Sequence, residues 1–212
     1  KTNKYKIYDV LGDGNCFFYS FIYGIKFNEP EIHRNNIQTI VKPIKDGLEK
    51  VLNENNVQYT NIQEFISKKA KEIPASYLVD GIATPNCIKY NYNLLALRYI
   101  LYYSLRNNDK DLYIQLLEGE FFQVLEREQL TGNTMFLQLY DRDGGSEKWR
   151  NENFPEIESY KKYMLTSNFW ANEWAIKIIQ DACNIQCLLF DEIANVIIGC
   201  RDHGGIRIEE NP

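Results

Sequence analysis

Residues 11–20 read LGDGNCFFYS, a tight turn followed at once by a hydrophobic run, and the interpretation of the whole chain starts from them. The turn combines two glycines with an aspartate and an asparagine, residue types that accept left-handed backbone. Residues 16–23 are almost all apolar and predict a buried helix. Cys16 therefore stands in the first turn of a helix, directly after a glycine-containing loop.

A thiol in this position is suited to nucleophilic chemistry. The unpaired N–H groups at a helix start favour negative charge, and so favour the thiolate, which is the reactive form of cysteine. The glycine turn lets further N–H groups point at the same place, where they can hold the oxyanion that forms when a thiolate attacks a carbonyl. The alternative is a structural cysteine buried after a tight turn, since free cysteines are commonly buried. The residues alone leave both interpretations open.

This segment resembles the signature of the ovarian-tumour (OTU) family of cysteine proteases, which are deubiquitinases. The signature reads Asp-Gly-Asn-Cys-Leu/Phe-Phe/Tyr-x-Ser/Ala, and residues 13–20, DGNCFFYS, match it without a gap. Residues 169–176, FWANEWAI, and 184–189, NIQCLL, resemble the helix-then-strand unit found later in the family. Residues 29–166 match only in the order of their elements and would form the variable, mostly helical part.

The resemblance implies an α+β fold of the OTU type, a papain-like arrangement in which helices and a helical arm flank a small central sheet. One catalytic domain would span residues 1–212, because no linker, repeat or low-complexity tract divides the chain. The hydrophobic pattern predicts helices at 37–53, 62–73, 94–105, 109–130 and 172–183. It predicts strands at 4–10, 185–190, 195–200 and 206–208, a loop at 74–88 and a surface excursion at 141–154.

The resemblance also assigns catalytic roles. Cys16 would be the nucleophile that attacks the carbonyl after the C-terminus of ubiquitin or a ubiquitin-like modifier. Asp13 would shape the adjacent loop. The backbone N–H groups of Asp13, Gly14 and Cys16 would form the oxyanion hole.

The general base is expected to be His203, which follows a predicted strand as the family's catalytic histidine does. That histidine is typically followed by an aromatic residue, whereas two glycines follow His203. A second interpretation therefore places the catalytic histidine beyond Pro212, and a third makes the chain a pseudoenzyme. The other histidine, His33, lies in a polar stretch and is predicted to be a surface residue.

Composition excludes several other classes of protein. The net charge of −5 argues against a nucleic-acid binder, which would carry a basic stripe. No apolar run reaches about 18 residues, so no membrane span is expected. The first residues, KTNKY, form no apolar stretch, so no signal peptide is expected. The 5 cysteines, with no Cys-x-x-Cys pair, favour free thiols in a reducing compartment. With only 2 histidines and no further ligands near Cys183 and Cys187, no metal or cofactor is expected.

Three functions follow as hypotheses. The first is a deubiquitinase acting on ubiquitin, polyubiquitin or a ubiquitin-like protein in the cytoplasm, or in the host cytoplasm for a viral or bacterial protein. The second is a module of the same family that binds ubiquitin without cleaving it, because the base is absent. The third is a viral or bacterial papain-like protease acting on its own polyprotein. The abundance of asparagine favours a virus or parasite as the source, and the charged segments 118–120 and 126–128 are predicted to be solvated.

Overall fold

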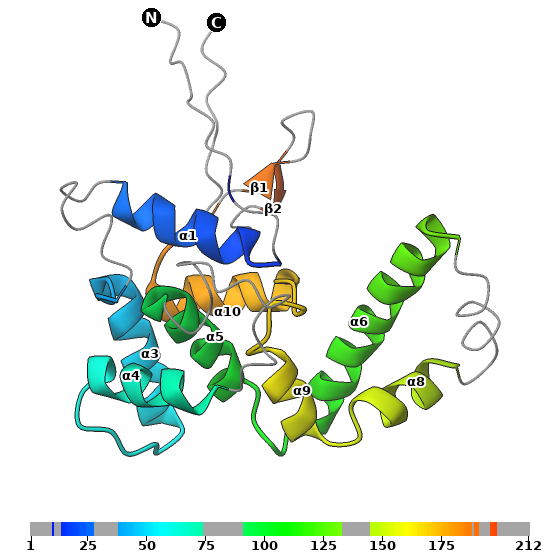
Figure 1. The fold of residues 1–212 in the computed structure, drawn as a ribbon, viewed down its shortest axis with the longest axis horizontal. Coiled ribbons are helices and arrows are strands. Elements are labelled where there is room, and N and C mark those ends of the chain that lie inside the picture. The colour runs from blue at the N-terminus through cyan, green and yellow to red at the C-terminus, as the bar shows by residue number, and fades with distance from the viewer. Residues whose placement is uncertain are drawn as a thin grey trace, which may run out of the picture.

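Helices make up most of the structure, a computed structural model that describes residues 10, 14–27, 38–73, 91–132, 145–187, 189–190 and 196–198 (Figure 1). Two short strands follow the last helix. The helices are α1 (Cys16–Lys26), α3 (Lys42–Glu54), α4 (Ile62–Glu72), α5 (Tyr92–Ser104), α6 (Lys110–Leu130), α8 (Gly145–Asn153), α9 (Ile157–Tyr163) and α10 (Glu173–Cys183), and the strands are β1 (Leu189–Phe190) and β2 (Val196–Ile198).

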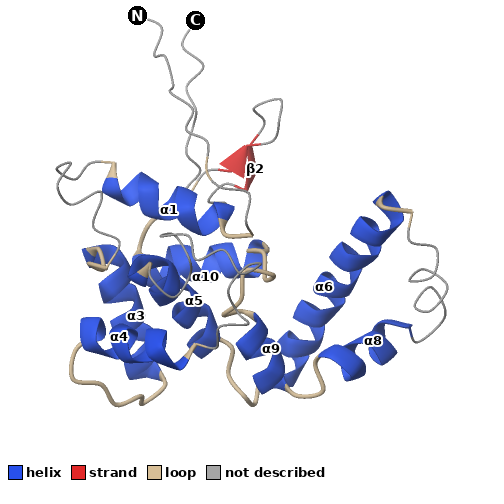
Figure 2. Ribbon diagram, in the orientation of Figure 1, coloured by secondary structure: helices blue, strands red, loops and turns tan. Residues whose placement is uncertain are grey.

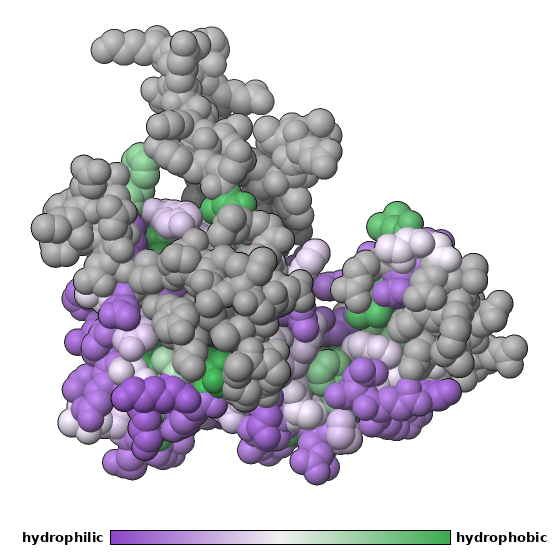
Figure 3. All heavy atoms as spheres, viewed as in Figure 1, coloured by the Kyte–Doolittle hydropathy of each residue, from purple (hydrophilic) through white to green (hydrophobic). Residues whose placement is uncertain are grey.

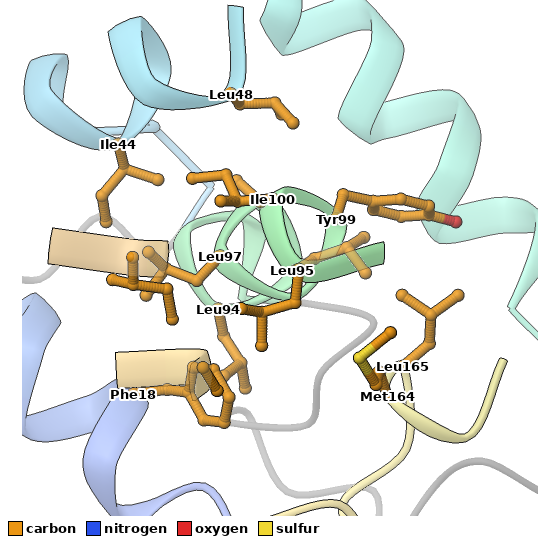
Figure 4. Packing of buried hydrophobic residues seen from close by; sticks show 14 of the residues in the cluster. Phe18, Ile44, Leu48, Leu94, Leu95, Leu97, Tyr99, Ile100, Met164 and Leu165 are labelled. Atoms are coloured by element: carbon orange, nitrogen blue, oxygen red, sulfur yellow. The ribbon is translucent and has the colours of Figure 1, made fainter. Parts of the chain in front are cut away.

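Helix α5 is the centre of the core. Its residues 94–101 are all buried, so this helix is enclosed on every side over two turns. Helices α1, α3, α4, α9 and α10 all contact it. A helix that is apolar around its whole circumference is expected to be buried, as the sequence LLALRYIL predicts. Figure 4 shows its side chains between those of neighbouring segments, which include Phe18, Ile44, Leu48, Met164 and Leu165.

Asparagine residues begin three of these helices. The side chains of Asn61, Asn91 and Asn172 each accept a hydrogen bond from the backbone N–H three residues on, at 2.8, 3.1 and 3.0 Å. Such a cap satisfies one of the donors that a helix start leaves unpaired and stabilises the helix by about 1 kcal/mol. Local sequence therefore sets where α4, α5 and α10 begin.

Helices α3 and α10 approach each other closely at Gly47. A Cβ atom at this position would lie 2.9 Å from the Ala182 carbonyl oxygen and 3.1 Å from the Cys183 Sγ. The glycine thus lets two backbones meet where any side chain would force them apart. Asn93 of α5 fixes the start of α3, because its Oδ1 accepts from the Val41 N–H at 2.9 Å.

Helices α6 and α8 lie to one side of this core and join it through α9 (Figure 2). Aromatic rings fill the space between them. Phe121 of α6 lies 5.6 Å from Trp149 of α8, measured between ring centroids, and Trp149 lies 5.5 Å from Phe154. Phe154 in turn contacts Tyr160 and Tyr163 of α9 at 5.4 and 5.1 Å. These contacts link α6 and α8 to the core.

The surface outside these contacts is mostly hydrophilic. On the face shown in Figure 3, hydrophilic residues cover most of the lower edge that the structure describes. None of the helices in the described ranges combines the length and the apolar character needed to cross a membrane.

The predicted α+β fold with a small central sheet is wrong for the part of the chain that the structure describes. There, the core is built from helices around α5, and β-structure is limited to β1 and β2. These two strands pair antiparallel, with Leu189 opposite Ile198 and Phe190 opposite Val196. The longer of them, β2, has three residues. So short a ladder provides no layer against which helices could pack.

Most predicted helices are confirmed, with shifted ends. The helix expected at 37–53 begins at Lys42, with Pro43 in its first turn, and the one expected at 109–130 is a single helix. The surface excursion expected at 141–154 is wrong over its described part, because residues 145–153 form α8 and bury Trp149. Helix α9 was not predicted. The strands expected at 4–10 and 206–208 and the loop at 74–88 lie outside the described residues, apart from Val10.

Candidate active site

Cys16 is the first residue of α1, and its side chain is exposed. Gly14, two residues earlier, has a φ of +81°, in the left-handed region that a glycine adopts most easily. The first intrahelical hydrogen bond runs from the Tyr19 N–H to the Asn15 carbonyl, at 2.9 Å. Over the described residues 14–16, the predicted succession of glycine, thiol and helix start is therefore confirmed, and the interpretation of Cys16 as a buried structural cysteine is wrong.

The turn before Cys16 lies against residues 167–170. A Cβ atom at Gly14 would lie 1.9 Å from the Ser167 carbonyl oxygen and 3.1 Å from the Trp170 Nε1. No other residue type fits at this point, because the obstructing atom belongs to the backbone. The Trp170 side chain remains 60% exposed beside the turn. The turn before Cys16 and residues 167–170 thus lie together, although they are more than 150 residues apart in the sequence.

Arg98, in the middle of α5, forms hydrogen bonds to residues beside both of these stretches. Its side chain is fully buried, at 0% exposure. The guanidinium donates from Nη2 to the Asn15 Oδ1 at 2.5 Å and from Nη1 to the Met164 carbonyl at 2.6 Å. Nη2 also donates to the Phe169 carbonyl at 3.3 Å, and the guanidinium carbon lies 4.4 Å from the centroid of the Phe18 ring. One side chain thus contacts the Cys16 turn, helix α1 and the segment that leads to Trp170.

Asn15 differs from the other asparagines that begin helices. Its side chain is buried, bonds to Arg98 and makes no capping hydrogen bond to α1. In α4, α5 and α10 the asparagine instead accepts from the N–H of the third helical residue, which in α1 is Phe18. The first turn of α1 is therefore not neutralised by its own N-cap side chain. This arrangement keeps the field of the helix start directed at whatever binds beside Cys16.

The other predicted catalytic residues lie outside the described residues. This holds for Asp13, for His203 and for His33, so the proposed roles of Asp13 and His203 stay predictions. Gly14 and Cys16, whose N–H groups were assigned to the oxyanion hole together with that of Asp13, are in place at the start of α1.

Two further cysteines are described, and neither resembles Cys16 in its surroundings. Cys183, at the end of α10, is buried, and Cys187 is half-buried. Burial, with a smaller contribution from Cys187, raises the pKa of Cys183 to about 12, so its thiol stays protonated at neutral pH. Among the residues that the structure describes, no cluster of His, Cys, Asp and Glu side chains could hold a metal ion.

Sequence reasoning missed Arg98 and Ser167 as parts of this site. Arg98 carried a signal, because it is the one charged residue in the otherwise apolar stretch 94–101. A buried arginine needs several acceptors, but the sequence does not identify them, since they lie 66, 71 and 83 residues away. Ser167 contributes only a backbone carbonyl and gives no sequence signal. Comparison with models of known families, with curated proteins and with solved structures finds no match to this chain.

Proposed function

We propose that the protein is a cysteine hydrolase that cleaves the peptide or isopeptide bond after the C-terminus of ubiquitin or a ubiquitin-like modifier. The observation that carries the proposal is the exposed thiol of Cys16 at the first position of α1, after a left-handed Gly14. An exposed thiol at a helix start, beside backbone N–H groups that can hold an oxyanion, is suited to nucleophilic attack on a carbonyl.

The reaction takes place in two steps. The Cys16 thiolate attacks the carbonyl carbon, and the carbonyl oxygen becomes an oxyanion held by the backbone N–H groups of Asp13, Gly14 and Cys16. When the tetrahedral intermediate collapses to a thioester, the C–N bond breaks and the amine leaves with the proton that a histidine took from the Cys16 thiol. A water molecule, deprotonated by the same base, then attacks the thioester, which releases the carboxylate and restores the thiol. His203 is the proposed base, and a histidine beyond Pro212 is the alternative.

The choice of substrate is supported by two stretches of sequence. Residues 13–20 resemble the OTU signature, and residues 169–176 resemble a later part of the same family. Residues from both stretches lie in contact, with Trp170 beside Gly14. The proposal rests on this local arrangement and on the resemblance, and it does not require a central sheet. The free thiols of Cys16 and Cys183 support a reducing compartment, which we propose to be the cytoplasm.

Hydrolysis of a fluorogenic C-terminal amide of ubiquitin tests the proposal. We expect turnover by the 212-residue chain and a loss of kcat of at least about a thousandfold in Cys16→Ala, because no nucleophile remains. Cys187→Ala is the matched control and should keep full activity. His203→Ala tests the candidate base: loss of activity assigns the role to His203, and unchanged activity excludes His203 from it.

Two results would contradict the proposal. Turnover that survives in Cys16→Ala would show that another residue is the nucleophile. No turnover of ubiquitin amides or ubiquitin chains by the wild-type protein, together with measurable binding of ubiquitin, would favour the non-cleaving module instead.

A further inference from the structure

The buried Arg98 contacts Asn15, the residue directly before Cys16. It belongs to the central helix α5, and its guanidinium bonds the Asn15 side chain as well as the carbonyls of Met164 and Phe169. These three acceptors are two backbone carbonyls and an amide oxygen, so the contacts orient backbone and amide groups around the guanidinium. A fully buried charged side chain is costly, and it is retained here at a point that touches both halves of the site.

We propose that Arg98 is a positioning residue for the reaction at Cys16. It holds the Asn15 side chain in the core, so that this asparagine does not cap α1 and the first-turn N–H groups stay directed at the reacting carbonyl. This inference rests on the function proposed above and deepens it. Arg98 itself does not touch the substrate, because it is buried beneath the turn.

The other helices of the protein show what Asn15 would do without Arg98. Asn61, Asn91 and Asn172 occupy the same position in their helices, and each accepts from the N–H of the third helical residue. An asparagine released from Arg98 has the same capping partner within reach, the Phe18 N–H. The planar guanidinium is suited to preventing this, because its fork reaches several acceptors at once, whereas a lysine ammonium is a single point of charge.

The test compares Arg98→Met with Asn93→Ala in the full chain. Both residues belong to α5 and are fully buried, but Asn93 bonds the start of α3 instead of the Cys16 turn. At a temperature where both variants are folded by circular dichroism, Arg98→Met should lower kcat by about tenfold to a hundredfold, the effect of misplacing a reacting group by about 1 Å. Its KM should change by less than about threefold. Asn93→Ala should lower the melting temperature with kcat unchanged.

Asn15→Ser provides the second variant, because it leaves Arg98 in place and a serine caps its own helix well. It should lower kcat as Arg98→Met does. The double variant should lower kcat little more than Arg98→Met alone, because Arg98→Met already removes the hydrogen bond to Asn15. If Arg98→Met fails to fold, Asn15→Ser decides the question with the same measurements.

Alkylation of Cys16 by iodoacetamide separates this inference from the proposed function. The rate at pH 7 should fall several-fold in Arg98→Met and in Asn15→Ser, and stay unchanged in Asn93→Ala. A wild-type protein that cleaves no ubiquitin substrate but shows this pattern would overturn the proposed function and leave the positioning role standing. Wild-type alkylation rates and wild-type kcat in folded Arg98→Met and Asn15→Ser would overturn the positioning role.

Discussion

Gly14 is the residue on which the candidate site depends most directly. Its left-handed backbone and its contact with the Ser167 carbonyl are separate constraints, and each excludes a side chain. Gly132 shares only the first of them: its φ is +73°, and nothing lies within 4 Å of the place a Cβ would occupy. Alanine substitutions at the two glycines therefore separate the energetic cost of the steric contact from the cost of left-handed backbone.

We expect Gly14→Ala to lower the free energy of unfolding by at least about 2 kcal/mol more than Gly132→Ala does. Both variants place alanine in left-handed backbone, but only Gly14→Ala drives a methyl group into a neighbouring backbone. Urea denaturation of the two variants gives the difference. Equal losses would mean that residues 167–170 do not lie against the Cys16 turn.

Glu120 of α6 is a second residue with an unusual environment, and the prediction that it is solvated is wrong. It is 4% exposed, and it accepts hydrogen bonds from the hydroxyls of Tyr160 at 3.2 Å and Tyr163 at 3.4 Å. Burial raises the pKa of this carboxyl from 4.5 to about 7, and the two tyrosine hydroxyls oppose the rise. Its neighbour Glu118 in the same charged segment is exposed, as predicted.

The stability of the protein should therefore fall as the pH rises from about 4.5 to 7, by at most about 3 kcal/mol from Glu120 alone. The raised pKa favours the folded state while the carboxyl is protonated, and this contribution is lost once the buried group ionises. Glu120→Gln should remove this part of the pH dependence, and Glu118→Gln should not. Urea denaturation at several pH values measures it, and identical profiles for wild type and Glu120→Gln would contradict the assignment.

Among the helices, the contact between α3 and α10 depends on Gly47. A glycine inside a helix normally costs about 1 kcal/mol relative to alanine, so its presence in α3 needs a reason. The reason is the backbone of α10, with the Ala182 carbonyl oxygen 2.9 Å from the position of a Cβ. Helix α10 leads from the Trp170 segment to β1, and so this contact also positions one side of the candidate site.

Gly47→Ala should destabilise the protein by about 1–3 kcal/mol, because the steric conflict with a backbone atom outweighs the gain in helix propensity. Gly119→Ala is the control: Gly119 lies in α6 with nothing within 4 Å of the added Cβ, and alanine there should stabilise by about 0.5–1 kcal/mol. Thermal unfolding of both variants tests the pair. A Gly47→Ala variant at least as stable as wild type would show that α3 and α10 are farther apart.

Sequence predicted the helices better than the sheet for a physical reason. Apolar spacing at 94–105 and 172–183 is local information, and α5 and α10 form at these places. A run such as 185–190 becomes a strand only if a partner lies beside it, and among its described residues pairing is limited to 189–190. The missed helix α9 is short, and its burial depends on rings from α6 and from Phe154, just after α8, rather than on its own pattern.

For the whole molecule, the features of the site that depend on local sequence could be predicted, and those that depend on contacts between distant segments could not. The position of Cys16 at a helix start followed from residues 11–23 alone. The contact of Gly14 with Ser167 and the bonds of Arg98 join segments far apart in the chain, so only the packing of α1, α5 and the loop before α10 reveals them. Glu120 was misplaced for the same reason, since its partner Tyr160 is 40 residues away.

Our central proposal is that Cys16 is the nucleophile that attacks the carbonyl at the C-terminus of ubiquitin. Ubiquitin carrying a thiol-reactive electrophile at its C-terminus tests this claim most directly, with peptide mapping by mass spectrometry to locate the adduct. We expect one ubiquitin per chain, attached at Cys16, and no adduct on Cys16→Ser. An adduct at Cys187, or no adduct on a folded protein whose Cys16 still reacts with iodoacetamide, would contradict it.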